Sequence, residues 1–155
     1  MKFLINGEFI DKSDHYDVIN PYNGEIVDTV PIAYRSDVDN AVEAANNAKK
    51  ALNDLSAKEV SINLYNACEE LEKESKNIAK LIVAEAGKPY KQAIGELQRS
   101  VETLQFAAEE AKRIYGESVP IDATGPTEAR FLAFTKKVPL GVVGAITPFN
   151  YPVNL

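Results

Sequence analysis

Short apolar runs separated by turn residues open the chain and predict two β-hairpins. The stretch KFLINGEFI places Asn6-Gly7 between two apolar segments, which is the strongest short signal for a tight hairpin turn. The pattern returns over residues 17–30, where Pro21 and Asn23-Gly24 supply the turn chemistry. The first 30 residues are therefore expected to be strand and turn.

Apolar residues then recur at helical spacing and predict three helices between about residues 36 and 115. Ser36 followed by Asp39 resembles a capping box at the start of the first helix. Ser56 followed by Glu59 repeats this signal for the second helix. We expect the apolar stripe of each helix to be buried.

Glycine and proline mark where the later helices end and begin. Gly87 predicts the end of the second helix, and Pro89 predicts the start of the third. The apolar face of the third helix continues to Tyr115, and Gly116 predicts its end.

The remaining residues predict extended structure. Residues 119–128 have the composition of a loop, and residues 130–138 are typical of an exposed or edge strand guarded by Lys136-Lys137. The run GVVGAIT, residues 141–147, is nearly continuously apolar, as in a strand buried on both faces. A turn and then Pro152 at a helix N1 position would complete a βα unit, with ligands bound beyond the end of the strand.

Asn150 lies in that turn, and its local chemistry leaves two interpretations open. Its amide can donate a hydrogen bond to a developing oxyanion. Asparagine is also a good N-cap, and local chemistry alone favours this role in capping the following helix. A buried-type strand without a following helix to cover it is an aggregation hazard, so we expect the chain to be the front part of a longer one.

Net charge, apolar runs and cysteine content argue against several classes of function. The net charge of −6, with mixed acids and bases, argues against a nucleic-acid partner. No apolar run reaches about 18 residues, which argues against a membrane-spanning helix. The single cysteine, Cys68, excludes an internal disulfide and suits a reducing, cytoplasmic location. No cluster of His, Cys and acidic residues has the spacing of metal ligands.

Several motifs together resemble the N-terminal part of the NAD(P)-dependent aldehyde dehydrogenase superfamily. They run nearly end to end, through LINGEFI, INPYNGEIV, DVDNAVEAANNAKKAL, the EAGKP and GEL stretches, and KKVPLGVVGAITPFNYP. The last segment is the most specific, because P-x-G-V followed by T-P-F-N-Y-P rarely arises by chance. Phe-Asn-Tyr-Pro-Val-Asn is most similar to lactaldehyde dehydrogenases and non-phosphorylating glyceraldehyde-3-phosphate dehydrogenases.

The resemblance implies roles for residues near the C-terminal end. Asn150 would be the catalytic oxyanion donor. The cofactor, NAD or NADP, would be bound on its nicotinamide side by Ile146, Thr147, Pro148 and Phe149.

Two further residues are implied in substrate binding. Arg99 aligns with an arginine that contacts substrate phosphate, although a helix-surface ion pair with Glu96 or Glu102 is the alternative. Tyr151 would border the aldehyde tunnel or simply pack. Cys68 lies on an apolar helix stripe and is interpreted as a core residue, so the family's nucleophilic Cys and general-base Glu are expected past Leu155.

The fold class expected is therefore α/β: β-hairpins and long helices leading into a Rossmann-like sheet. Residues 1–118 would form the hairpins and helices, residues 119–139 an extended oligomerisation segment, and residues 140–155 the first buried strand and turn. The parent would oxidise a small aldehyde and form a homo-oligomer, a dimer or tetramer, with no nucleic-acid or membrane partner. The alternative is a non-catalytic helical binding or assembly module that pairs through the 130–138 strand.

Overall fold

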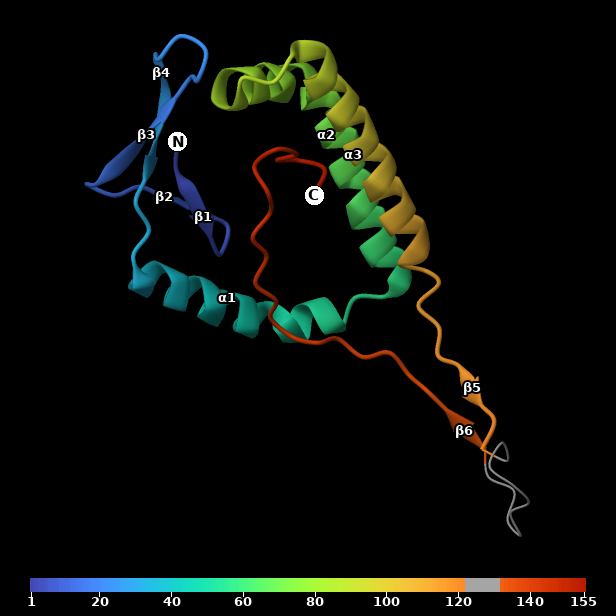
Figure 1. Ribbon diagram of the computed structural model, residues 1–155. Helices are drawn as coiled ribbons and strands as arrows, with labels where there is room; N and C mark the ends of the chain where they lie inside the picture. The colour runs from blue at the N-terminus through green and yellow to red at the C-terminus, as the bar shows by residue number, and fades with distance from the viewer. Residues whose placement is uncertain (122–131) are drawn as a thin grey trace.

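Two β-hairpins open the structure, a computed structural model that describes residues 1–121 and 132–155 (Figure 1). Strands β1 (Phe3–Ile5) and β2 (Glu8–Ile10) pair antiparallel around Asn6 and Gly7. Both turn residues have positive φ, 53° and 81°, as the favoured two-residue hairpin turn requires. The first predicted hairpin is confirmed.

The second hairpin is also confirmed. Strands β3 (His15–Ile19) and β4 (Ile26–Pro31) pair antiparallel, with a register shift near Val18 and Ile19. The turn closes through the Gly24 N–H, which donates to the Asn20 carbonyl at 2.9 Å. Gly24 has φ of 75°, which explains why glycine occupies this position.

Helix α1 (Arg35–Asn53) begins earlier than the Ser36/Asp39 pattern predicted, because a different acid turns back on the helix start. The carboxylate of Asp37 accepts the Tyr34 N–H at 2.9 Å and pairs with Lys12 Nζ at 2.7 Å. The hydrogen bond from Lys12 and that from the Tyr34 backbone lower the pKa of Asp37. Lys12 follows β2, so this pair ties the first hairpin to α1.

Helices α2 (Ala57–Ala86) and α3 (Tyr90–Glu110) lie side by side as an antiparallel hairpin (Figure 1). Both predicted signals for α2 are confirmed. The Glu59 N–H donates to Ser56 Oγ at 3.2 Å, the Ser56 N–H donates to Glu59 Oε2 at 2.8 Å, and Gly87 ends the helix with φ of 63°.

Small side chains let α2 and α3 approach closely. Cys68 is buried and its Sγ lies 3.8 Å from the Val101 carbonyl oxygen, so its interpretation as a core residue is confirmed. Burial raises the pKa of the Cys68 thiol, which keeps it unreactive. Among the residues that the structure describes, the buried hydrophobic ones are Cys68, Ala79, Ile82, Ala93, Leu97 and Ala108.

Helix α3 ends at Glu110, and the prediction that it runs to Tyr115 and stops at Gly116 is wrong. Turns replace the last predicted helical turn, and Arg113 Nη2 pairs there with Glu110 Oε1 at 2.7 Å. Gly116 serves another purpose. A Cβ at this position would lie 1.7 Å from the carbonyl oxygen of Thr135, so glycine permits two backbone segments to approach.

Replacement of Gly116 by alanine is expected to destabilise the protein by about 1–3 kcal/mol, because the new methyl group overlaps backbone that cannot swing away. Gly95→Ala is the matched control, since a Cβ there meets nothing within 4 Å and lies inside α3. This control should gain about 0.5–1 kcal/mol. Thermal unfolding of both variants measures the difference, and equal melting temperatures would contradict the close approach at Gly116.

The extended segments are shorter than predicted. Only Ala133–Phe134 (β6) of the predicted 130–138 strand is a strand, and it pairs with β5 (Ser118–Val119); residues 122–131 lie outside the described part. Residues 141–147 form no strand and are exposed, so the expected buried strand is wrong here. A strand needs a neighbour for its N–H and C=O groups, and within the described residues none pairs with this run.

Candidate functional site

The final segment of the chain passes α1 and then turns toward the α2–α3 hairpin (Figure 1). Along α1 it leaves a cavity of about 400 Å³, which Val38, Val42 and Val142 help to line. Val38 and Val42 are about half exposed, so the expected burial of the α1 stripe does not hold among the described residues. This segment therefore reaches the helical hairpin over an open apolar surface.

The predicted site residues around Asn150 lie in a compact turn against α2 and α3. The Leu155 N–H donates to the Tyr151 carbonyl at 3.3 Å, which closes one turn of chain. Val153 packs against the buried cluster of the two helices. The turn is thus anchored on a rigid element.

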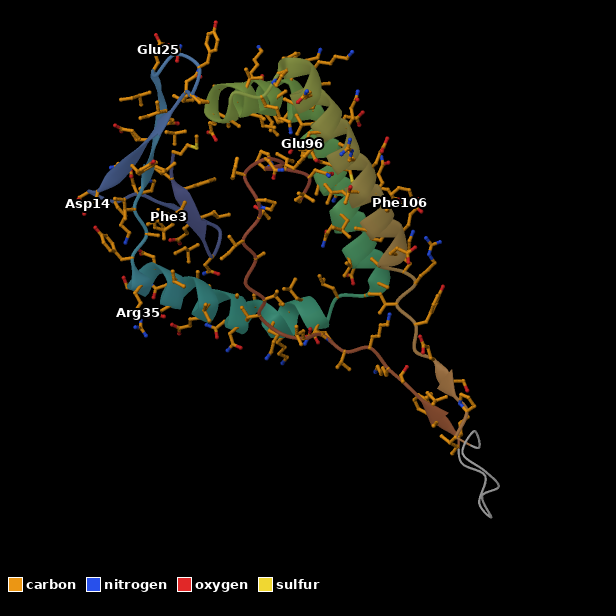
Figure 2. All side chains as sticks on the ribbon, viewed as in Figure 1. Phe3, Asp14, Glu25, Arg35, Glu96 and Phe106 are labelled. Atoms are coloured by element: carbon orange, nitrogen blue, oxygen red, sulfur yellow. The ribbon has the colours of Figure 1, made fainter. Side chains whose placement is uncertain are left out.

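A buried carboxylate receives the backbone of this turn. Glu96, on α3, is 2% exposed. Its Oε1 accepts the N–H of Val153 at 3.0 Å and the N–H of Asn154 at 3.4 Å. Figure 2 shows Glu96 beside the C-terminal turn. The carboxylate satisfies two N–H groups that the short turn leaves unpaired.

Lys88 completes the contact from the connection between α2 and α3. Its Nζ lies 2.5 Å from Glu96 Oε2 and donates to the Asn150 carbonyl at 3.0 Å. The same ammonium lies 3.9 Å from the centre of the Tyr151 ring, within the range of a cation–π interaction.

The charge of Glu96 is maintained by these contacts. Burial raises the pKa of the Glu96 carboxyl, but hydrogen bonds from Lys88 and the Val153 backbone outweigh it, so the pKa is lowered overall. The carboxylate therefore stays ionised at neutral pH, and Lys88 neutralises it.

Asn150 itself is exposed at the mouth of a cavity of about 330 Å³. The capping interpretation fails, because Pro152 has no N–H and the N–H of Val153 is taken by Glu96. The carboxamide of Asn150 is therefore not needed by its own turn. The cavity is lined by Ala86, Lys88, Pro89, Gln92, Phe149, Asn150 and Tyr151.

The other predicted residues are Arg99 on α3 and the four residues that precede Asn150 in the chain. Arg99 Cζ lies 6.0 Å from the centre of the Tyr151 ring. Of its two alternative partners, Glu96 pairs with Lys88 instead, and no ion pair joins Arg99 to Glu102 in the described part of the chain. The predicted cofactor residues Ile146, Thr147, Pro148 and Phe149 are all exposed.

Lys88 and Glu96 were missed as site residues by the sequence analysis. The sequence gives Glu96 only as a possible ion-pair partner of Arg99, and it assigns no role to Lys88. One feature of the sequence could have identified them: Lys88 lies in the EAGKP stretch and Glu96 in the GEL stretch, and both stretches are part of the family resemblance.

The described residues carry two further findings. None of their helices is long and apolar enough to cross a membrane. In the same part of the chain, no group of three or more His, Cys, Asp or Glu residues is arranged to hold a metal ion.

Comparisons with known proteins agree with the resemblance. The model of the aldehyde dehydrogenase family matches residues 9–155. The chain is 40% identical over 151 residues to the 3-sulfolactaldehyde dehydrogenase of Priestia megaterium, covering 97% of this chain and 31% of that protein. It is 38% identical over 152 residues to the lactaldehyde dehydrogenase of Methanococcus aeolicus, covering 98% of this chain and 31% of that protein.

Solved structures show the same fold. The NADP-dependent glyceraldehyde-3-phosphate dehydrogenase of Bacillus halodurans, crystallised with NADP, superposes with a TM-score of 0.90 at 33% identity. The match covers 99% of this chain and 33% of that one. The expected α/β architecture is confirmed as the N-terminal part of such chains, and this chain spans about a third of the length of the relatives it matches. The chain belongs to the aldehyde dehydrogenase family.

Proposed function

We propose that the protein carrying residues 1–155 oxidises a small aldehyde to its carboxylic acid with NAD⁺ or NADP⁺. The observation that carries this proposal is the TPFNYP turn. Its Asn150 is exposed and free of a capping role, and the backbone of the turn is anchored on the α2–α3 hairpin by Lys88 and Glu96. An oriented neutral donor suits a developing oxyanion.

The proposed reaction passes through a covalent bond between the enzyme and the aldehyde. A cysteine thiolate from beyond these residues adds to the aldehyde carbon, and the carbonyl oxygen becomes an oxyanion that accepts a hydrogen bond from the Asn150 amide. Loss of hydride leaves a thioester, and water hydrolyses it to the acid and the free thiol. Residues 1–155 alone are proposed to be inactive, because their one cysteine is the buried Cys68.

The exposed segment before Asn150 fits a dinucleotide. Ile146 and Phe149 present largely exposed apolar side chains and Thr147 adds a hydroxyl, a combination that suits the flat face and ribose of a nicotinamide nucleotide. NAD(P)⁺, when bound, accepts the hydride from the substrate. Relatives include NADP-dependent and NAD-dependent enzymes.

The names of the relatives suggest the substrate class. They include enzymes of 3-sulfolactaldehyde, lactaldehyde and glyceraldehyde 3-phosphate. We propose a short aldehyde of this kind, with Arg99 and Tyr151 at its binding site. Arg99 lies beside Tyr151 and forms an ion pair with neither Glu96 nor Glu102 in the described structure, which leaves its guanidinium able to bind an anionic group.

Replacement of Arg99 by alanine is expected to raise the KM for glyceraldehyde 3-phosphate by about 10–100-fold, because a charge-assisted hydrogen bond to the phosphate is lost. The KM for uncharged lactaldehyde should stay nearly constant. Steady-state kinetics with both substrates measure the difference. Arg35→Ala, at an exposed arginine on α1, is the control. An unchanged KM for the phosphorylated aldehyde would remove Arg99 from the site.

The reaction is tested by following oxygen into the product. The full-length protein is incubated with lactaldehyde and NAD(P)⁺ in water enriched in heavy oxygen. Hydrolysis of a thioester should place at least one heavy oxygen in each lactate formed, and a second one wherever the aldehyde carbonyl has already exchanged its oxygen with water. Formation of reduced cofactor without a labelled acid would contradict the proposed hydrolysis.

Assembly and location are also proposed. Phe134 of β6 and the neighbouring Leu132 are largely exposed, and the short β5–β6 pair has open edges that suit pairing with a second copy in a dimer or tetramer. A reducing, cytoplasmic location is proposed because Cys68 is the only cysteine and is buried as a free thiol.

A further inference from the structure

In the TPFNYP turn, the backbone N–H groups are accepted by a side chain from another element and not by the Asn150 side chain. A helical turn that starts at Asn150 leaves its first N–H groups without partners inside the turn, and an asparagine at this position ordinarily folds its own side chain back onto them. Pro152 contributes no N–H. The N–H groups of Val153 and Asn154 both donate to Glu96 Oε1. A carboxylate from another element thus replaces the side chain of Asn150 as the cap.

Lys88 holds the other side of the same residue. Its ammonium donates to the Asn150 carbonyl at 3.0 Å and lies 3.9 Å from the centre of the Tyr151 ring. Lys88 also pairs with Glu96. The two members of this ion pair therefore bind the backbone at two points: Lys88 binds the Asn150 carbonyl, and Glu96 binds the N–H groups that follow Pro152. The first attachment is on Asn150 itself, so the backbone that carries the Asn150 side chain is held directly.

Both members of the pair are fixed in place. The side chain of Glu96 is fully buried and that of Lys88 is 12% exposed. Lys88 follows the left-handed Gly87 at the end of α2, and Glu96 lies within the second turn of α3. The pair therefore transfers the rigidity of the helical hairpin to the turn.

We infer that Lys88 and Glu96 are positioning residues for the proposed oxyanion donor: by capping and clamping its turn, they leave the Asn150 carboxamide directed at the substrate and not at its own backbone. This inference rests on the proposed function. It assigns no contact with substrate to either residue. Their effect on the reaction is exerted through Asn150.

A double-mutant cycle tests the inference in the full-length protein. Glu96→Gln keeps an acceptor oxygen but removes the charge, and Lys88→Met removes the clamp at the Asn150 carbonyl. Each single variant should lower kcat by about 10–100-fold, because a misplaced catalytic group loses rate steeply with distance. The KM for the cofactor should change little.

The same substitutions are then made in an Asn150→Ala background. If the pair acts through Asn150, its loss should lower kcat less than about threefold there, because residues acting as a unit are not additive. A merely structural pair would lower kcat by the same factor in both backgrounds, and that result would overturn the inference. Glu70→Gln and Lys73→Met, at an exposed pair on α2, are the matched controls.

The outcomes separate this inference from the proposed function. If Asn150→Ala leaves kcat unchanged, the proposed oxyanion role fails. If Asn150→Ala is slow while Glu96→Gln and Lys88→Met are as fast as the unsubstituted enzyme, only the positioning inference fails. Lys88→Arg, which keeps the charge, should recover most of the rate lost in Lys88→Met.

A second measurement remains available if the buried variants do not fold. Hydrogen exchange of the unsubstituted full-length protein reports on the N–H groups of Val153 and Asn154. Hydrogen bonds to buried Glu96 should protect both groups. Exchange as fast as in an unstructured peptide would show that Glu96 does not cap the turn, and would overturn the inference.

Discussion

Replacement of Asn150 by alanine in the full-length protein is expected to lower kcat by about 10²–10³-fold, the usual cost of one oxyanion donor. The KM for the aldehyde should change much less, because the hydrogen bond strengthens only as charge develops on the oxygen. The fold should be preserved, since the turn is held by Lys88 and Glu96 and not by the Asn150 side chain. Steady-state kinetics together with thermal unfolding measure both effects.

Two further variants sharpen this prediction. Asn150→Asp keeps the size of the side chain but replaces the donor with a negative charge, so it should be at least as slow as Asn150→Ala. Asn63→Ala, at an exposed asparagine on α2, should be as fast as the unsubstituted enzyme. A kcat for Asn150→Ala within about threefold of normal would contradict the oxyanion role.

Replacement of Lys88 by methionine is expected to lower the free energy of unfolding by about 3–5 kcal/mol, the typical cost of removing one partner of a buried ion pair. The variant leaves Glu96 buried and without its cation, and removes the contact with the Tyr151 ring. Denaturant unfolding measures the loss. Lys73→Met is the control, because its pair with Glu70 is exposed and should contribute about 1 kcal/mol or less.

The stability difference should also depend on pH in a defined direction. In the unsubstituted protein the lowered pKa of Glu96 means that its contribution is full above the ordinary glutamate pKa of about 4.3 and is lost as the pH falls through the lowered value. Without Lys88, burial raises this pKa, so the variant gains relative stability as the pH falls. The difference in free energy of unfolding between the unsubstituted protein and Lys88→Met should therefore become smaller in acid. A difference that grows as the pH falls would contradict the ion-pair account.

The elements predicted correctly are those whose conformation is decided by residues close together in the sequence. The turn at Asn6-Gly7, the cap at Ser56 and the stop at Gly87 each depend on residues within one turn of chain, and the structure confirms all three. The errors arise where distant residues decide. Lys12 favours Asp37 over Asp39 at the start of α1, and Thr135 explains Gly116 better than a helix end does.

The same distinction applies to the site. The motif identifies Asn150 but does not distinguish an oxyanion donor from an N-cap. The hydrogen bond from the Val153 N–H to Glu96, 57 residues away in sequence, excludes the capping role. Glu96 follows helical spacing like any other acid on α3, so no local pattern marks it as a buried partner of the turn. Arg99 and Tyr151 were predicted separately, and the structure places them side by side.

The most direct test of the central proposal is the rate at which the full-length protein forms reduced cofactor from small aldehydes. Lactaldehyde, 3-sulfolactaldehyde and glyceraldehyde 3-phosphate are each supplied with NAD⁺ and with NADP⁺. The proposal predicts that at least one combination of aldehyde and cofactor gives sustained turnover. Asn150→Ala should reduce kcat for that combination by about 10²-fold or more. A folded full-length protein that reduces neither cofactor with any small aldehyde would contradict the proposal.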